Sequence, residues 1–331
     1  MTKEGRVSLE LGSGGRTMRE FIAGRILPAF ADPALGLLLD ASHLPAGIAF
    51  TTDSYVVDPI VFPGGDIGKL AVNGTVNDLV VSGAEPRYLS LGLILEEGLE
   101  WSLLDRVLAS IRRAARTAGV RIVTGDTKVV RQGQGDKLFI NTSGIGRVIA
   151  RPRPKAVRPG DRIILTGTLG EHSVAIMSAR GEFGFEASVK SDCAALNFLL
   201  PFWKRGVLWM RDITRGGLAT ILSELAADVP HPLLIEEEKI PLSRPVRAAA
   251  ELLGIDPLYL ACEGRAALIA PANKADGILA GLKSHPLGRK AAIIGEVGGK
   301  IGKKGELILK TEAGGHRLLE LLTSELLPRI C

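Results

Sequence analysis

The sequence contains few aromatic residues and no long apolar run, and each shortage excludes a class of protein. Phe, Trp and Tyr make up 5% of the 331 residues, too few for the stacking platforms of single-strand nucleic-acid binders. No apolar run reaches the roughly 18 residues that indicate a membrane span, and the first residues do not resemble a signal peptide. The net charge of +5 is mild and no Lys/Arg cluster stands out. We therefore expect neither nucleic acid nor a membrane as a partner.

Cysteine is also scarce. Cys193, Cys262 and Cys331 are odd in number and far apart, so they form neither a disulfide framework nor a CxxC metal site. This usage fits a reducing cytoplasm, which would keep Cys331 a free thiol.

The last cysteine ends the printed sequence, after Pro328, Arg329 and Ile330. The pattern over residues 316–327 predicts a helix that Pro328 ends, because proline has no N–H group. Chain ends are mobile unless tied down, so the sequence predicts a thiol on a mobile tether. Taken alone, the tail fits an ordinary frayed end better than a functional tether.

What is present indicates a globular chain of about two domains, with 46% hydrophobic and 23% charged residues. A Pro- and Arg-rich stretch at 150–160 marks the boundary. Strands alternate with helices, which predicts an α/β or α+β class. The predicted units are a glycine-rich lid and N-terminal segment (1–34), an N-terminal domain (35–149), a C-terminal domain (158–316) and a C-terminal helix with a mobile tail (317–331).

The first half has an acidic strand end followed by a polar stripe. A strand over 47–53 ends at Asp53, a suitable place for a Mg²⁺ ligand. A glycine-rich turn at 62–66 then leads into a helix that carries Lys69, Asn73 and Asp78 about one turn apart. Such a stripe is either solvated or lines a site. A Walker A loop is excluded, because Pro63 occupies a required glycine position and Leu70 the Ser/Thr position.

A second acidic segment follows in the same half. We expect a strand over 87–97, a helix over 103–118 that Gly119 ends, and a strand over 120–123. Asp126 and Lys128 then lie in a predicted loop at 125–128.

Three other glycine-containing segments indicate phosphate binding or catalysis. Residues 11–16 do not complete a dinucleotide motif and instead predict a lid whose Gly14 and Gly15 N–H groups meet phosphate, with an ordinary loop as the alternative. The segment 212–217 repeats the theme of 66–71, an acid, a cation and glycine before an apolar helix start. Glu263 stands beside Gly264 just before a strand over 266–270.

Together these segments resemble the HypE family of hydrogenase maturation proteins, within the superfamily that includes aminoimidazole ribonucleotide synthetase and selenophosphate synthetase. The resemblance covers nearly the whole chain and is most specific in the last four residues. It implies a two-domain fold whose N-terminal domain dimerises through its sheet, with ATP bound between the domains.

The resemblance also implies a reaction on the chain's own terminus. The carbamoyltransferase HypF would load Cys331 with a carboxamide, ATP and Mg²⁺ would support its dehydration to a thiocyanate, and a HypC–HypD complex would receive the cyano group for the iron of [NiFe]-hydrogenase. Such chemistry needs metal-binding carboxylates, phosphate-binding groups, a cation and a base.

The roles that follow are expectations. We assign Glu263 as the base and Lys128 as the charge stabiliser beside Cys331. The metal candidates are Asp53, Asp78 and Asp126. The nucleotide candidates are Gly14, Gly15, Lys69, Asn73, Asp212, Arg215 and Gly216.

The chain departs from the family pattern at three positions: Leu11 replaces the usual His, Ser173 the usual Gly and Cys262 the usual Asn. Two alternatives stay open. One is another ATP-dependent synthetase of the superfamily; however, a selenophosphate synthetase usually has a reactive Cys or selenocysteine near the lid, and the first cysteine here is Cys193. The other is a non-catalytic scaffold that docks by its C-terminus.

Overall fold

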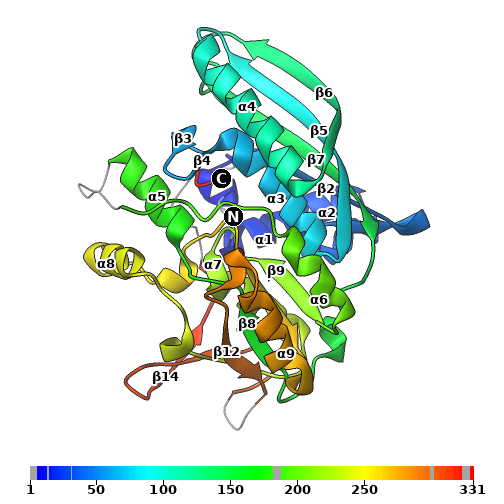
Figure 1. The fold of residues 1–331 in the computed structure, drawn as a ribbon, viewed down its shortest axis with the longest axis vertical. Coiled ribbons are helices and arrows are strands. Elements are labelled where there is room, and N and C mark those ends of the chain that lie inside the picture. The colour runs from blue at the N-terminus through cyan, green and yellow to red at the C-terminus, as the bar shows by residue number, and fades with distance from the viewer. Residues whose placement is uncertain (1–5, 13–14, 31, 182–187, 299–301, 323–328) are drawn as a thin grey trace.

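The computed structural model describes residues 6–12, 15–30, 32–181, 188–298, 302–322 and 329–331. Two α/β units, each built on its own sheet, lie against one another (Figure 1). The Pro- and Arg-rich stretch at 150–160 connects the last strand of the first sheet with the first strand of the second.

The first sheet has five strands and one covered face. In spatial order they are β1 (Ser42–Leu44), β2 (Ile48–Tyr55), β7 (Leu138–Val148), β5 (Ala84–Glu96) and β6 (Arg121–Val130). Neighbours are antiparallel except β5 and β6, which are parallel. The helices α3 (Ile67–Val81) and α4 (Trp101–Ala118) cover the inner face (Figure 1). A small hairpin of β3 (Val61–Phe62) and β4 (Gly65–Asp66) precedes α3.

The second sheet has seven strands. In spatial order they are β14 (His316–Leu319), β13 (Leu307–Lys310), β10 (Leu233–Glu236), β12 (Ala292–Val297), β8 (Arg162–Leu165), β11 (Ala266–Ala270) and β9 (Trp209–Asp212). The helices of this half are α5 (Glu171–Arg180), α6 (Leu200–Lys204), α7 (Gly217–Asp228), α8 (Arg244–Leu253) and α9 (Ala272–Lys283). The N-terminal segment forms α1 (Gly15–Phe21), a π-helical turn (Ile22–Ile26) and α2 (Leu27–Phe30).

The predicted helix over 103–118 is confirmed as α4. Its buried residues keep helical spacing, and Gly119 ends it in the left-handed conformation at φ 68°.

Two sequence predictions are wrong. The segment 125–128 is not a loop, because β6 continues through it as the edge strand of the sheet. The helix predicted from residue 316 is not formed there either: His316–Leu319 is strand β14, which pairs antiparallel with β13. Main-chain pairing to β13 overrides the local helical pattern. Residues 323–328, including Pro328, lie outside the described residues.

The helix α3 lies between the two sheets and is buried almost all round. Asp66 caps its start by accepting a hydrogen bond from the Lys69 N–H at 2.9 Å. Thirteen of its 15 residues are buried, and the two exceptions are Lys69 and Asp78. A helix with this pattern belongs inside a protein, so α3 fixes the position of one domain against the other.

Asn77 on α3 fastens the two domains by hydrogen bonds. Its Nδ2 donates to the Ala194 carbonyl at 3.1 Å and to the Glu263 carbonyl at 3.3 Å, and its Oδ1 accepts from the Leu196 N–H at 2.8 Å. All three partners belong to the second half of the chain. Within the part of the chain that the structure describes, no helix is both long and apolar enough to cross a bilayer.

We expect Asn77→Ala to lower the free energy of unfolding by roughly 2–4 kcal/mol, because it leaves buried main-chain groups without partners. Chemical denaturation measures this. Asn73→Ala on the same helix is the matched control, since the side-chain contact of Asn73 is a single long one to Cys193 Sγ at 3.5 Å. Equal losses in the two variants would contradict the assignment.

Candidate active site

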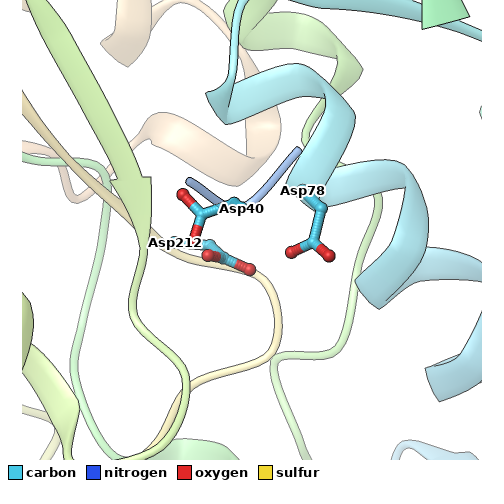
Figure 2. Close-up of side chains that lie close together, drawn as sticks. All are labelled: Asp40, Asp78 and Asp212. Atoms are coloured by element: carbon cyan, nitrogen blue, oxygen red, sulfur yellow. The ribbon is translucent and has the colours of Figure 1, made fainter. Parts of the chain in front are cut away.

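Three carboxylates meet where the two domains face one another. Asp40 precedes β1, Asp78 lies on α3, and Asp212 is the last residue of β9. Their oxygen atoms all lie within 4.8 Å of one another. Figure 2 shows the three side chains around one common space.

Polar neighbours hold the three carboxylates in place. The Thr51 hydroxyl lies 2.7 Å from the Asp40 carbonyl and 2.9 Å from Asp78 Oδ2. The Arg211 guanidinium pairs with Asp40 at 3.2 Å and with Glu224 at 3.0 Å. Arg211 therefore orients Asp40 from the other domain.

Burial and mutual repulsion disfavour ionisation in this cluster. Burial, with the added charge of Asp40, raises the pKa of Asp212 to about 8. Burial and the charge of Asp212 raise the pKa of Asp78 well above its usual value. The site therefore favours protons or a cation between these groups.

The cluster borders a cavity of about 200 Å³, which we call the carboxylate cavity. Asp53, Glu263 and Cys331 line it together with the three carboxylates. Burial raises the pKa of Asp53 as well. The structure thus brings together six predicted site residues from the first half, the second half and the tail of the chain: Asp53, Asp78, Asp212, Arg215, Glu263 and Cys331.

Glu263 is fixed by its main chain and has one free carboxylate oxygen. Its N–H donates to Asp192 Oδ1 at 3.0 Å, and its carbonyl accepts from the Ala194 N–H at 3.3 Å. Its Oε1 is buried without a hydrogen-bond partner among the described residues. Burial, followed by the charge of Asp212, raises the pKa of Glu263 well above its usual value. A Cβ on Gly264 would lie 2.0 Å from the Asp192 carbonyl oxygen, so this turn requires glycine.

The end of the chain is docked beside Glu263. Ile330 is buried, and Cys331 lines the carboxylate cavity. The Val56 N–H donates to the Cys331 main-chain oxygen at 3.1 Å. Figure 1 places this end of the chain near β4, in the middle of the molecule.

A second cavity of about 360 Å³ adjoins the first and shares Arg211, Thr214 and Arg215 with it. Its other walls include Gly15 and apolar side chains: Met18, Ile22, Leu37, Leu38 and Ile221. We call it the lid cavity. Gly14 lies outside the described residues.

Gly216 has a structural reason of its own for being glycine. It precedes α7 at φ 75°, and a Cβ there would lie 2.3 Å from Thr220 Oγ1. The turn that places Thr214 and Arg215 at both cavities depends on this conformation.

Lys69 and Asn73 are not brought to the carboxylates. They line a separate cavity of about 750 Å³, whereas Gly74 and Asp78 of the same helix line the carboxylate cavity. The predicted polar stripe is therefore divided between two faces of α3. Nucleotide binding by Lys69 and Asn73 stays a prediction without support from this geometry.

Asp126 and Lys128 also lie apart from the cavity. They form an ion pair at 2.8 Å on β6, each with 69% of its side chain exposed. Asp126 lies opposite Gly92, and Gly92 opposite Asn141, so the row crosses from β6 over β5 to β7. With β2 beyond β7 and strands about 4.8 Å apart, Asp126 is roughly 14 Å from the strand of Asp53.

Two residues of the site were not predicted from the sequence. Asp40 was missed because no motif surrounds it. Asp192 was missed because its role is to accept the N–H of a residue 71 positions away. Spatial convergence across domains leaves no local spacing signal in either case.

Two departures from the family pattern point away from the cavity. The Ser173 hydroxyl donates to the Ala261 carbonyl at 3.1 Å, and Cys262 Sγ accepts from the Gly170 N–H at 3.2 Å. Both are buried and serve local packing. Leu11 lies in the 3₁₀ turn Leu9–Gly12 ahead of the lid.

Comparison with known proteins agrees with this geometry. The chain matches the AIR synthase related protein N-terminal domain over residues 39–148 and the corresponding C-terminal domain over 158–308. It is 45% identical to the carbamoyl dehydratase HypE of Rhodobacter capsulatus, over 99% of each chain. The chain belongs to the carbamoyl dehydratase HypE family.

Solved HypE structures share the fold. One is a HypE in complex with ATP, with a TM-score of 0.82 and 47% identity, which covers 98% of this chain and 100% of that chain. Another is a HypE–HypF complex, with a TM-score of 0.86 and 40% identity over 91% of this chain and 99% of that chain.

The donor set of the carboxylate cluster fits Mg²⁺. Asp40, Asp78 and Asp212 offer only oxygen atoms, and Mg²⁺ takes a few carboxylates and keeps several waters. Of the predicted metal ligands, Asp78 belongs to the cluster and Asp53 borders the same cavity. Asp126 does not line this cavity.

We expect Mg²⁺ affinity to rise with pH and to level off above about 8, because protons compete with the cation until Asp212 is ionised. The pKa of Asp212 in the folded protein, about 8, lies above the usual 3.8. The stability of the metal-free protein should therefore fall as the pH rises from the usual value toward about 8. Calorimetric titration with Mg²⁺ at several pH values, with thermal unfolding alongside, measures both.

Asp40→Asn is the informative variant, because it removes the largest charge that raises the pKa of Asp212. It should weaken Mg²⁺ binding and shift the pH dependence downward. A pH-independent affinity in the unchanged protein would contradict the assignment of this cluster.

Proposed function

We propose that this protein is an ATP-dependent carbamoyl dehydratase that converts a carboxamide on Cys331 to a thiocyanate. One observation carries the proposal: Cys331 and Glu263 line the same cavity as the three clustered carboxylates. The Oε1 atom of Glu263 has no hydrogen-bond partner among the described residues. The family membership supports the same reaction.

The chemistry proceeds in two balanced steps. In the first, the amide oxygen bonds to the γ-phosphorus of ATP, the bond between that phosphorus and the β–γ bridging oxygen breaks to release ADP, and Glu263 takes one proton from the amide nitrogen. In the second, the C–O bond breaks and the remaining N–H proton leaves with the released phosphate, which gives the nitrile. Phosphorylation is needed because hydroxide is a poor leaving group.

Glu263 is the proposed base. Its buried Oε1 has no partner among the described residues, so it is free to accept the amide N–H. Its raised pKa brings its proton affinity closer to what proton abstraction near neutral pH requires. The Asn77 and Asp192 contacts hold its main chain still.

The two adjoining cavities suit the two ends of ATP. The apolar walls of the lid cavity suit a purine, with Gly15 at its edge. Thr214 and Arg215 lie at the junction, where the phosphates would pass toward the carboxylates. Mg²⁺ bound by Asp40, Asp78 and Asp212 would neutralise charge on those phosphates.

We also propose a homodimer through the outer face of the first sheet. This face carries exposed apolar side chains: Ile48, Phe50, Tyr88, Ile94 and Ile145, each 40–45% exposed. A second copy of the chain bound to this face would also give Asp126 and Lys128 a role at a site. The strand register places Asp126 in a row with Asn141 across this face. The Asn141 side chain contacts Thr52 and Ser54, which flank Asp53. Lys128 would then stabilise charge at the carboxamide of the partner copy.

The reaction implies further partners in a cytoplasmic setting. A HypF carbamoyltransferase would load Cys331, as the known HypE–HypF complex suggests. A HypC–HypD complex would take the cyano group to iron for [NiFe]-hydrogenase.

Glu263→Gln should accumulate the carboxamide on Cys331, because removal of a positioned base typically slows a reaction by about 10²–10⁴-fold. Intact-protein mass spectrometry after incubation with HypF, carbamoyl phosphate and ATP shows which group is attached. Cys331→Ala is the control and should bind ATP without modification. Cyano-modified protein from Cys331→Ala would mean that another cysteine is the carrier. If the group found on Cys331 of the unsubstituted protein did not depend on ATP, the scaffold alternative would be favoured.

Mixing two inactive variants tests the shared site. A dimer of one Lys128→Ala chain and one Glu263→Gln chain contains one site with both native residues, provided that Lys128 acts across the interface. We expect dehydration to reappear in such mixed dimers, and sedimentation checks that they form. If activity stays lost in confirmed mixed dimers, Lys128 does not act from the partner copy.

A further inference from the structure

The last three residues are held by main-chain hydrogen bonds to the segment 56–58. The Val56 N–H donates to the Cys331 main-chain oxygen at 3.1 Å, and the Asp58 N–H donates to the Arg329 carbonyl at 3.3 Å. The two segments run antiparallel here without forming a regular strand, since Arg329 has a left-handed backbone at φ 53°. The Ile330 carbonyl lies between these two bonded carbonyls and takes no part in the pairing.

His172 on α5 satisfies that remaining carbonyl. Its Nε2 lies 2.7 Å from the Ile330 oxygen, and its Nδ1 lies 2.8 Å from the Ser191 hydroxyl. A carbonyl only accepts, so Nε2 carries the proton and Nδ1 accepts from Ser191. The Ser191 oxygen in turn accepts from the Cys193 N–H at 3.1 Å. This chain of bonds fixes one tautomer and one ring orientation.

The surroundings of His172 keep the ring neutral and immobile. It is fully buried, and burial lowers its pKa. The Phe62 ring packs edge-on against it, with 5.4 Å between centroids and an interplanar angle of 87°. The imidazole therefore serves as a fixed N–H donor aimed at the tail.

The other end of α5 holds the neighbouring tail residue. Arg180 donates from Nη2 to the Arg329 carbonyl and from Nε to the Asp58 carbonyl, both at 2.7 Å. The Arg329 side chain donates to the Val56 carbonyl at 2.9 Å and pairs with Asp136 at 2.5 Å. One helix thus grips two successive tail carbonyls, and the contacts of His172 lie one residue from Cys331.

We infer that His172 is a positioning residue for the dehydration. Its Nε2–H bond to the Ile330 carbonyl sets the place of Cys331 against Glu263. This inference rests on the proposed function, and it assigns His172 no contact with the reacting atoms. The bond matters differently for the two stages of the reaction. Loading by HypF would use the undocked tail, whereas dehydration would use the docked tail.

His172→Phe tests this, because it keeps a flat ring and removes the donor, whereas His172→Gln keeps an N–H donor at the ε position. The first readout is the rate at which a thiol reagent labels Cys331; Cys193 and Cys262 are buried and should label slowly. The second is loading by HypF, and the third is conversion of loaded carboxamide to thiocyanate in a single turnover with ATP.

We expect His172→Phe to label about tenfold faster and to dehydrate about tenfold more slowly, the size of one lost hydrogen bond, while loading and ATP binding stay unchanged. His172→Gln should restore much of both rates. Should His172→Phe fail to fold, Ser191→Ala removes the partner that orients the ring and should shift the same two rates in the same directions by a smaller factor.

Unchanged labelling and dehydration in His172→Phe, or in Ser191→Ala where that variant stands in for it, would overturn the inference. Equal losses of loading, ATP binding and dehydration would overturn it too, since they indicate a general structural role. If instead the unsubstituted protein fails to dehydrate a loaded Cys331, the proposed function fails, which is a distinguishable result.

Discussion

Repulsion among three close carboxylates is the constraint on which this structure depends. Oxygen atoms of Asp40, Asp78 and Asp212 lie within 4.8 Å of one another in a largely buried place. Like charges there resist ionisation, so the cluster favours protons or a bound cation. Arg211 offsets part of the repulsion at Asp40, and the Thr51 hydroxyl contacts Asp78.

The three acids come from different parts of the chain, so the site exists only when the two domains are docked. Asp78 stands on a helix buried between both sheets, and its neighbour Asn77 ties that helix to the strand end that carries Glu263. A mobile α3 would relax the repulsion by letting Asp78 move away. The near-complete burial of this helix thus serves the carboxylate cluster as well as the core.

The environment of each thiol favours Cys331 as the proposed carrier. Burial raises the pKa of Cys193 to about 12 and that of Cys262 well above its usual value, which disfavours the thiolate form of both. Cys331 is the cysteine that lines the carboxylate cavity. Its place at the end of the docked tail allows a group to be brought in by the chain itself.

The sequence predicted much of the fold, and the reason is that those elements are local. The helix over 103–118 follows from apolar spacing and a glycine stop, and α3 follows from the glycine-rich turn ahead of it. Strand β14 was missed because its pairing with β13 is a contact that local periodicity does not record. The loop assigned to Asp126 was wrong for the same reason, since pairing with β5 extends β6 through it.

The residues of the site differ in the same way, because some stand in local motifs and others depend on distant contacts. Asp78, Asp212 and Glu263 stand in recognisable motifs and were predicted. Asp40 pairs with Arg211, and His172 contacts the Ile330 carbonyl. Both partners are far away in sequence, so no spacing pattern marks these two residues. Lys69 lies in a motif yet points to another cavity, because the two faces of a buried helix serve different surroundings.

The strength of tail docking has to suit an exchange between two enzymes. Ordering three residues costs about 1–2 kcal/mol each in backbone entropy. Burial of Ile330 contributes roughly 1.5–3 kcal/mol, and each tail hydrogen bond adds a net of about 0.5–1.5 kcal/mol. Gains and costs therefore lie within a few kcal/mol of one another, so the loss of one well-formed bond shifts the balance. When the tail leaves, it breaks these carbonyl bonds, the packing of Ile330 and the side-chain contacts of Arg329 with Val56 and Asp136. Reversible docking of this kind is what a carrier needs if HypF is to load the thiol that the cavity later encloses.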